Sequence, residues 1–134
     1  MRKVFVDTGA FIARAIAADD LHRVAVKTWA TLTRTALVSS EHVFDETMTL
    51  LARRVGYPYA AQWGELHLQS KAIEWISTQR DDLTAAVMLM KKYADQSISF
   101  TDCVSFHLMR KQRIREAFGF DRHFQIAGFS LLRT

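Results

Sequence analysis

Short runs of apolar residues recur along the chain and are separated by polar or glycine-containing turns. Runs of this length, rich in valine, leucine, isoleucine and phenylalanine, are typical of buried β-strands. The pattern predicts strands at Val4–Val6, Leu37–Ser39, Lys71–Ile76, Ala117–Phe120 and Ser130–Leu132.

Longer segments between these runs place apolar residues three or four positions apart, which is the spacing of one helix face. They predict helices over Ala10–Ala17, from Asp19-Asp20 to about Leu32, over Val43–Val55, from Pro58 to about Ser70, over Leu83–Ala94 and over Thr101–Lys111. Alternating strands and helices favour an α/β domain with a central, mostly parallel sheet. In such sheets ligands bind at the carboxyl ends of the strands, near the point where the strand order reverses.

The composition is that of one folded domain. The chain has 134 residues, 49% of them hydrophobic, without an evident linker or repeat, so we expect a single domain over residues 1–134. Its one cysteine, Cys103, excludes an internal disulfide and a cysteine-rich zinc site. The longest apolar run, Ala85–Met90, is far shorter than the roughly 20 residues that span a bilayer, so we expect a cytoplasmic protein with no membrane association. The net charge of +4 favours a polyanionic partner.

Two aspartates follow predicted strands. Asp7 ends the first apolar run, and Asp121 comes directly after Ala117–Phe120. If both strands belong to one parallel sheet, the two carboxylates emerge at the same edge. Each aspartate can instead cap the helix that follows it, because the side-chain oxygens of aspartate accept hydrogen bonds from helix N-termini.

Two further acids lie on predicted helices. At 100° per residue, Glu46 falls at the boundary of the buried stripe of Val43–Val55, whereas Asp45 points away from that stripe. Asp102 shares its helix face with two apolar residues at positions 106 and 109, which favours an inward direction. The alternative for Asp102 is a capping box, in which its carboxylate bonds back to the backbone of Ser99.

Four converging carboxylates require compensation, because like charges a few ångströms apart raise one another's pKa. A divalent cation supplies it, and oxygen ligands favour Mg²⁺ or Mn²⁺ over zinc. Without these four acids, eighteen basic residues remain against ten acidic ones. An acidic metal site within a basic body suits cleavage of a phosphodiester backbone.

The segments around the four acids resemble the acidic motifs of the PIN-domain nucleases, in order and over essentially the whole chain. The motifs read Val-Phe-Val-Asp7-Thr-Gly-Ala, Phe-Asp-Glu46-Thr, Ser-Phe-Thr-Asp102-Cys-Val-Ser-Phe and Phe-Gly-Phe-Asp121-Arg-His-Phe. The single-domain length is similar to that of the VapC toxins of toxin–antitoxin pairs. The resemblance implies a Rossmann-like α/β/α sandwich and an endoribonuclease that depends on Mg²⁺ or Mn²⁺ and leaves 5′-phosphate and 3′-hydroxyl ends.

The same resemblance implies roles for particular residues and partners. Metal binding and catalysis fall to the four motif acids, Asp7, Glu46, Asp102 and Asp121. Thr8 and Thr101 stand beside these acids and are expected to orient ligands or water, while Arg122 is a candidate contact to the RNA backbone. The expected partners are RNA, a small cognate antitoxin protein and a second copy of the chain.

Two other functions compete with this interpretation, and the residues argue against the first of them. Asp7-Thr8-Gly9-Ala10 is also the signature of dimeric aspartic proteases, but that class is all-β, and the helical periodicity contradicts it. The second alternative is a nucleic-acid-binding or interaction module that keeps the acids without turnover. Three histidines at positions 42, 107 and 123 are interpreted as structural or surface residues, because they do not form a His-x-x-x-His pair.

Overall fold

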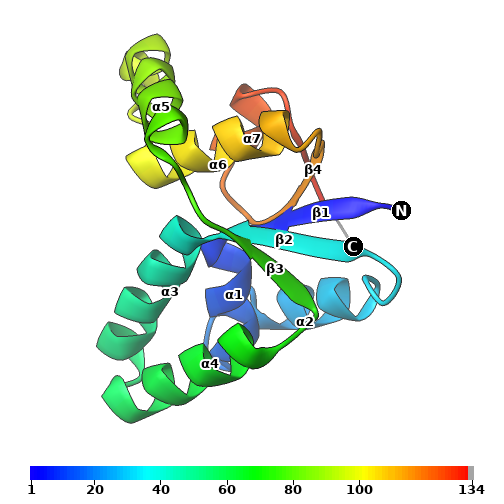
Figure 1. The fold of residues 1–134 in the computed structure, drawn as a ribbon. Coiled ribbons are helices and arrows are strands. Elements are labelled where there is room, and N and C mark those ends of the chain that lie inside the picture. Colours follow the sequence, from blue (N-terminus) through cyan, green and yellow to red (C-terminus); the bar gives the residue numbers. More distant parts are fainter. Residues whose placement is uncertain (133–134) are drawn as a thin grey trace.

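Five parallel strands form the centre of the computed structural model, which describes residues 1–132. The strands are β1 (Lys3–Val6), β2 (Ala36–Ser40), β3 (Ile73–Ile76), β4 (Glu116–Phe118) and β5 (Ser130–Leu131). They lie in the order β3-β2-β1-β4-β5, and each neighbouring pair is parallel (Figure 1). The predicted parallel sheet is therefore confirmed.

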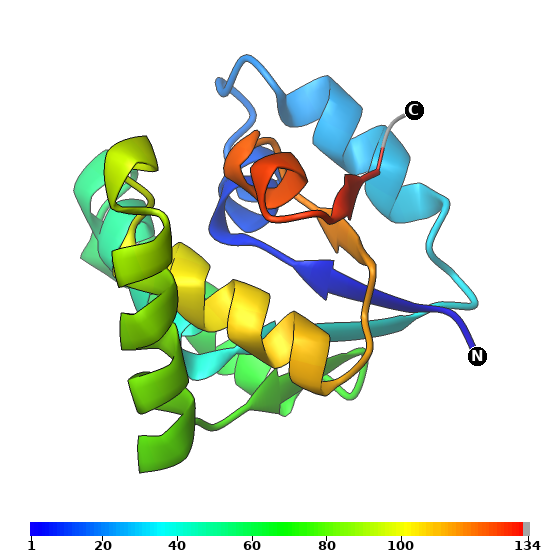
Figure 2. The same ribbon diagram turned by 90° about the horizontal axis from the view of Figure 1, so that it is seen from above.

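Helices cover both faces of this sheet. They are α1 (Thr8–Ala15), α2 (His22–Ala30), α3 (Glu41–Arg54), α4 (Tyr57–Gln69), α5 (Arg80–Lys92), α6 (Phe100–Lys111) and α7 (His123–Ile126), with a short 3₁₀ helix η1 (Ala94–Gln96). Figure 1 shows α1–α4 on one side of the sheet and α5–α7 on the other, and Figure 2 shows α5 beside α6. The predicted α/β/α sandwich is confirmed, and the all-β aspartic protease alternative is excluded.

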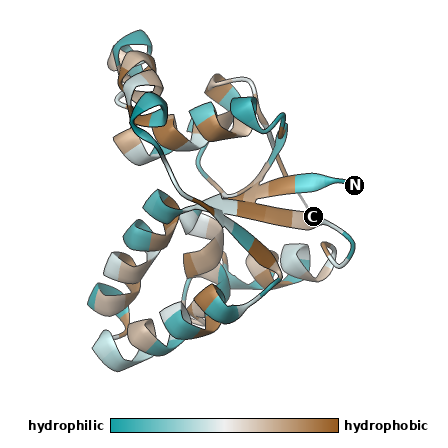
Figure 3. Cartoon of the chain, in the orientation of Figure 1, coloured by the Kyte–Doolittle hydropathy of each residue, from teal (hydrophilic) through white to brown (hydrophobic). Residues whose placement is uncertain are grey.

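The core lies where the helices pack against the sheet. Residues 4–6 of β1 are fully buried, because β1 is the middle strand and helices cover both of its faces. Figure 3 shows the inner parts of β1 and β2 as hydrophobic. On the α1 side, the Phe11 ring lies 5.5 Å from both the Trp63 and the Trp75 ring centroids. The tryptophans therefore contribute to packing, as aromatic side chains of this size commonly do.

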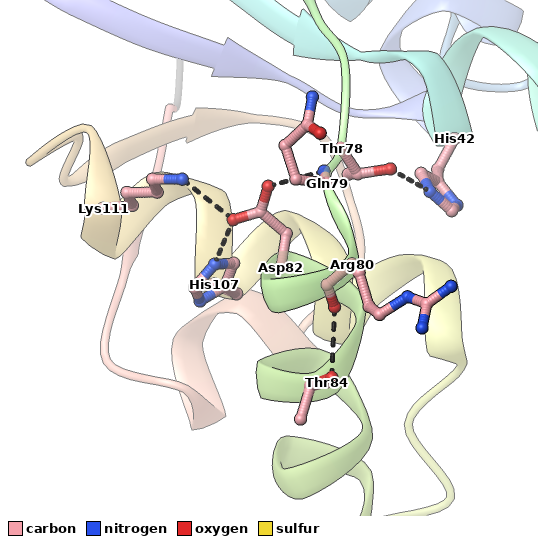
Figure 4. A network of polar contacts seen from close by, with 8 residues as sticks. All are labelled: His42, Thr78, Gln79, Arg80, Asp82, Thr84, His107 and Lys111. Carbon is pink, nitrogen blue, oxygen red and sulfur yellow. Dashed lines mark hydrogen bonds and ion pairs between the residues drawn. The ribbon is translucent and has the colours of Figure 1, made fainter.

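A buried carboxylate joins α5 to α6 (Figure 4). Asp82 is 2% exposed, and its Oδ2 accepts a hydrogen bond from the backbone N–H of Gln79 at 2.9 Å. Its Oδ1 lies 2.8 Å from His107 Nε2 and 3.0 Å from Lys111 Nζ on α6. These contacts, the Gln79 N–H first, hold the pKa of Asp82 below its usual range. His107 is a structural residue here, as the sequence predicts.

His42 also has a structural partner, because its Nε2 lies 3.1 Å from the Thr78 hydroxyl (Figure 4).

Within residues 1–132 we find no helix with both the length and the apolar character that crossing a membrane requires.

The chain changes direction across the sheet between β1 and β4. From β1 it adds β2 and β3 on one side, and it later returns to add β4 and β5 on the other. The register pairs Val6 with Phe118, so the carboxyl ends of β1 and β4 lie next to each other. This is the switch point at which α/β sheets bind their ligands.

Candidate active site

A cavity of about 390 Å³ opens at the carboxyl ends of β1 and β4. Its walls come from the start of α1, from α3, from the start of α6 and from the segment that follows β4. The four acids that the sequence singled out all line it: Asp7, Glu46, Asp102 and Asp121. Segments more than a hundred residues apart in sequence thus meet around one space.

Asp7 stands between β1 and α1. Its backbone N–H donates to Phe118 O at 2.9 Å, and its carbonyl accepts from Ala10 N at 3.1 Å, so strand pairing and the first helical turn both fix its position. Its side chain makes no capping hydrogen bond, and within the described residues its buried Oδ1 has no partner. Burial, followed by the charge of Asp102, raises the pKa of Asp7 well above its ordinary value. A buried carboxylate oxygen without a hydrogen-bond partner indicates that a ligand binds at this position.

Gly119 brings the end of β4 against Asp7. A Cβ placed on Gly119 would lie 3.0 Å from Asp7 Cβ and 3.4 Å from Asp7 Oδ2. The predicted strand 117–120 ends two residues earlier, at Phe118, so Asp121 does not follow the strand directly. The backbone leaves the ladder at Gly119 and reaches the cavity from beside Asp7.

Gly119→Ala is expected to lower activity more than stability. The added methyl group requires the Asp7 carboxylate to shift by a few tenths of an ångström, and misplacement by about 1 Å can cost about 100-fold in rate. We expect kcat to fall by roughly 10-fold, measured as cleavage of a labelled RNA, the substrate that the sequence resemblance implies. In Gly9→Ala the methyl group would meet no atom closer than 3.8 Å, so we expect a smaller loss. Equal losses in both variants would contradict this account.

Glu46 reaches the cavity from the second turn of α3. That helix begins where the Ser40 hydroxyl accepts a hydrogen bond from Val43 N at 3.1 Å. Glu46 is half-buried, while Asp45 is exposed and Thr47 is buried, as the helical angles predict. Glu46 lies close enough to Asp7 and Asp102 to contribute to the raised pKa of each.

Asp102 lies in the first turn of α6 and is 6% exposed. Its backbone N–H donates to the Ser99 hydroxyl at 3.1 Å, which is half of the capping box. The other half, from the Asp102 carboxylate back to Ser99, is not formed among the described residues, and the carboxylate lies at the cavity instead. Burial, with the neighbouring charge of Asp121 next in size, raises the pKa of Asp102 to about 7.

Asp121 and His123 stand together at the start of α7. Asp121 Oδ1 accepts a hydrogen bond from the backbone N–H of His123 at 2.9 Å, in the manner of an Asx turn. The predicted capping role of Asp121 is wrong, because the N-cap residue of α7 is Arg122. His123 Nδ1 lies 3.2 Å from Asp121 Oδ1 and 3.6 Å from Asp102 Oδ2, without hydrogen-bond geometry. Donor atoms of these three residues lie within 4.8 Å of one another and could hold a metal ion.

His123 lies in the site, although the sequence interpretation makes it a structural or surface residue because no histidine-pair motif marks it. The informative signal is its place two residues after the acid of the fourth motif. Because residues two positions apart can meet in a turn, this spacing puts the imidazole beside the Asp121 carboxylate.

Of the three residues expected to support the acids, Thr8, Thr101 and Arg122, only Thr8 lines the cavity. Thr8 lines the cavity, and within residues 1–132 its buried hydroxyl has no partner. Thr101 does not line the cavity, whereas Ser99 does. Arg122 is exposed and lines a neighbouring hollow of about 150 Å³, whose wall of Phe120 is shared with the acidic cavity.

The chain is an all-parallel α/β/α sandwich with four acids at its switch point. The comparison with protein families agrees with this description. The model of the PIN domain matches residues 4–129, so the chain belongs to the PIN domain family. Over 131 residues it is 33% identical to the 23S rRNA-specific endonuclease VapC20 of Mycobacterium tuberculosis, covering 97% of this chain and 98% of that protein.

Solved structures agree on the fold. The crystal structure of M. tuberculosis VapC20, described as a toxin that cleaves the sarcin–ricin loop, superimposes with a TM-score of 0.91 at 33% identity and covers 98% of this chain and 99% of that one. The structure of VapBC2 from Rickettsia felis bound to a promoter DNA fragment gives a TM-score of 0.72 at 10% identity, with 97% of each chain covered. The second likeness concerns the fold alone.

Proposed function

We propose that this chain is an endoribonuclease that depends on Mg²⁺ or Mn²⁺ and acts as the toxin of a VapBC-type toxin–antitoxin pair. The observation that carries the proposal is the meeting of four carboxylates in one cavity of a chain that is 33% identical to an rRNA endonuclease. The catalytic residues and metal ligands that we propose are Asp7, Glu46, Asp102 and Asp121.

The residues at the cavity fit a divalent cation. Asp7 Oδ1 is buried, and no described residue satisfies it, while the carboxylate of Asp102 faces that of Asp121 with His123 alongside. Carboxylate oxygens are the ligands that Mg²⁺ and Mn²⁺ prefer. When bound, such an ion supplies Lewis-acid polarisation of a phosphate oxygen and lowers the pKa of a coordinated water.

The chain's own residues supply orientation and proton transfer. Asp7 and Asp102 are fixed by backbone hydrogen bonds at the starts of α1 and α6, so they present their oxygens without reorganisation. The Asp121 side chain is 40% exposed against 9% for Asp102, which supports a role for Asp121 in accepting a proton through water. Exposed Arg122 lies beside the cavity, where a guanidinium can bind the RNA backbone.

The proposed partners follow from the relatives and from the surface. VapC20 is described as specific for 23S rRNA, so that RNA is the first substrate to test. We propose that the activity is cytoplasmic. A cognate antitoxin and a second copy of the chain both need apolar docking area. Exposed large apolar side chains stand on α4 and α5: Tyr57, Leu66, Leu68, Val87, Met88 and Met90.

The direct test is metal-dependent cleavage. Purified protein is incubated with a labelled hairpin of the 23S rRNA sarcin–ricin loop and with an unstructured RNA of equal length. We expect cleavage with Mg²⁺ or Mn²⁺, none with EDTA, and recovery when excess Mn²⁺ is returned, because the carboxylates alone repel the phosphodiester. The new 5′ ends are expected to carry phosphate.

Folded protein that binds these RNAs but cuts none of them with either metal would instead identify a binding module. Co-expression with the short open reading frame next to the gene tests the toxin role separately. Relief of growth inhibition by that frame supports the pair, and its failure would leave the nuclease assignment intact.

A further inference from the structure

The acidic cavity extends beyond the four carboxylates along α3. Glu46, Leu50 and Arg54 all line it and are spaced four residues apart, so they form one stripe along that helix. Eight residues of α-helix span about 12 Å. The cavity therefore has four acids at one end and, at the other, the cation Arg54 beside Asp19.

Arg54 is the one basic side chain among the described residues that line this cavity. Its Nη1 lies 3.0 Å from Asp19 Oδ2, and its guanidinium makes no other hydrogen bond within residues 1–132. The side chain is 44% exposed. Most of its donors therefore have no protein partner within the described residues, and a guanidinium fork suits a phosphate group.

Asp19 does not depend on Arg54 for its position. Its other oxygen, Oδ1, accepts a hydrogen bond from Leu21 N at 2.9 Å, and its backbone N–H donates to Ile16 O at 3.0 Å. The turn before α2 is thus held locally, in the manner of an Asx turn. An exposed ion pair of this kind contributes little stability, so exchanging its carboxylate for another anion costs little.

Apolar side chains lie between the two ends of the cavity. Leu50 lies between Glu46 and Arg54 on α3, and Ile12 of α1 and Leu21, which is 40% exposed, also line the cavity. Apolar surface of this kind can contact the face of a nucleobase, since single-stranded RNA is commonly bound through its unstacked bases and its phosphates. The order along the cavity is acids, apolar surface, cation.

We propose that Arg54 binds a second phosphate of the RNA strand, displacing Asp19, while a nucleotide next to the cleaved bond lies over Leu21 and Leu50. The inference rests on the proposed nuclease function and adds the path of the bound RNA, because the strand then runs along α3. Asp19 competes with that phosphate, so Asp19→Asn is expected to tighten RNA binding.

The test compares Arg54→Ala with Arg53→Ala, its exposed neighbour on the same helix, which does not line the cavity. On a long single-stranded RNA, Arg54→Ala is expected to raise KM about 10-fold and to leave kcat within about 2-fold of the parent value. The slope of the logarithm of the binding constant against the logarithm of the salt concentration is expected to fall by the amount that corresponds to about one phosphate contact. Arg53→Ala is expected to match the parent protein. Arg54→Lys is expected to recover part of the affinity.

RNA length separates binding from a structural role. Substrates are shortened stepwise on each side of the cleaved bond. We expect the Arg54→Ala defect to disappear once one side is too short to reach Arg54, and to persist when only the other side is shortened. A defect that is equal on all lengths, or that is shared by Arg53→Ala, would overturn the inference.

Failure of the nuclease assignment is distinguishable from failure of this inference. If the parent protein cuts no RNA, equilibrium binding of the same RNAs still compares the two arginine variants. Weaker binding by Arg54→Ala alone supports the subsite, and equal binding by both variants contradicts it. Thermal melts of each variant show whether the fold is preserved.

Discussion

Asp102→Asn is expected to lower the rate of RNA cleavage by at least about 100-fold, because residues that merely orient a metal ligand already contribute about 10–100-fold. The substitution removes one anionic donor, that of buried Asp102, from the cluster with Asp121 and His123 and hardly changes the volume of the side chain. The measurement is single-turnover cleavage of a labelled RNA over a range of Mn²⁺ concentrations. The amide is a weaker ligand, so the metal concentration at half-maximal rate is expected to rise as well.

Asp45→Asn is the matched control for this result. Asp45 is also an aspartate near the site, but it is exposed on α3 and does not line the cavity. We expect its cleavage rate to stay within about 2-fold of the parent, since exposed substitutions outside a site rarely perturb it. If Asp102→Asn cut RNA as fast as Asp45→Asn, the proposed metal centre would be wrong.

Asp102→Asn is also expected to stabilise the protein when metal is removed. The pKa of Asp102 is raised to about 7, whereas an aspartate in the unfolded chain titrates near about 4. Between these values the folded state holds a proton that the unfolded state has released, so stability falls as pH rises through this window. In EDTA at pH 8, we expect Asp102→Asn to melt roughly 3–8 °C higher than the parent protein.

Thermal melts from pH 4 to pH 8 test this account. The metal-free parent is expected to lose stability along this range, with Asp7 acting in the same direction because its pKa is also raised. Asp102→Asn is expected to give a shallower slope, and Mn²⁺ is expected to stabilise the parent more than the variant. A parent protein whose stability rises steadily over this range in EDTA would refute the link between the carboxylate cluster and stability.

The positions of the acids were predictable where they depend on local geometry. Asp7 follows a strand, and the helical angles separate buried Thr47 from exposed Asp45, so periodicity alone places Glu46 at the edge of the buried face. That these segments meet follows from the rule for parallel sheets. The element order and the all-parallel pairing agree with the predicted α/β fold.

What could not be predicted depends on contacts between distant segments or on elements too short to show a period. The approach of Gly119 to Asp7 and the pairing of Arg54 with Asp19 join residues that carry no shared motif. Helix α7 has four residues, little more than one helical turn, so no periodicity reveals it or the position of His123. The half-formed capping box shows why a local pattern at Asp102 did not decide between a structural role and a functional one.

The strand order also has a consequence for biosynthesis. Since β4 pairs with β1 from the far end of the sequence, Asp121 joins Asp7 only after more than a hundred intervening residues have been made. Such long-range pairing forms late in folding, because the chain must lose the entropy of closing a long loop before the strand contacts can stabilise it. A chain still emerging from the ribosome therefore carries an incomplete set of carboxylates, and the acidic cavity is assembled only after Asp121 has been made.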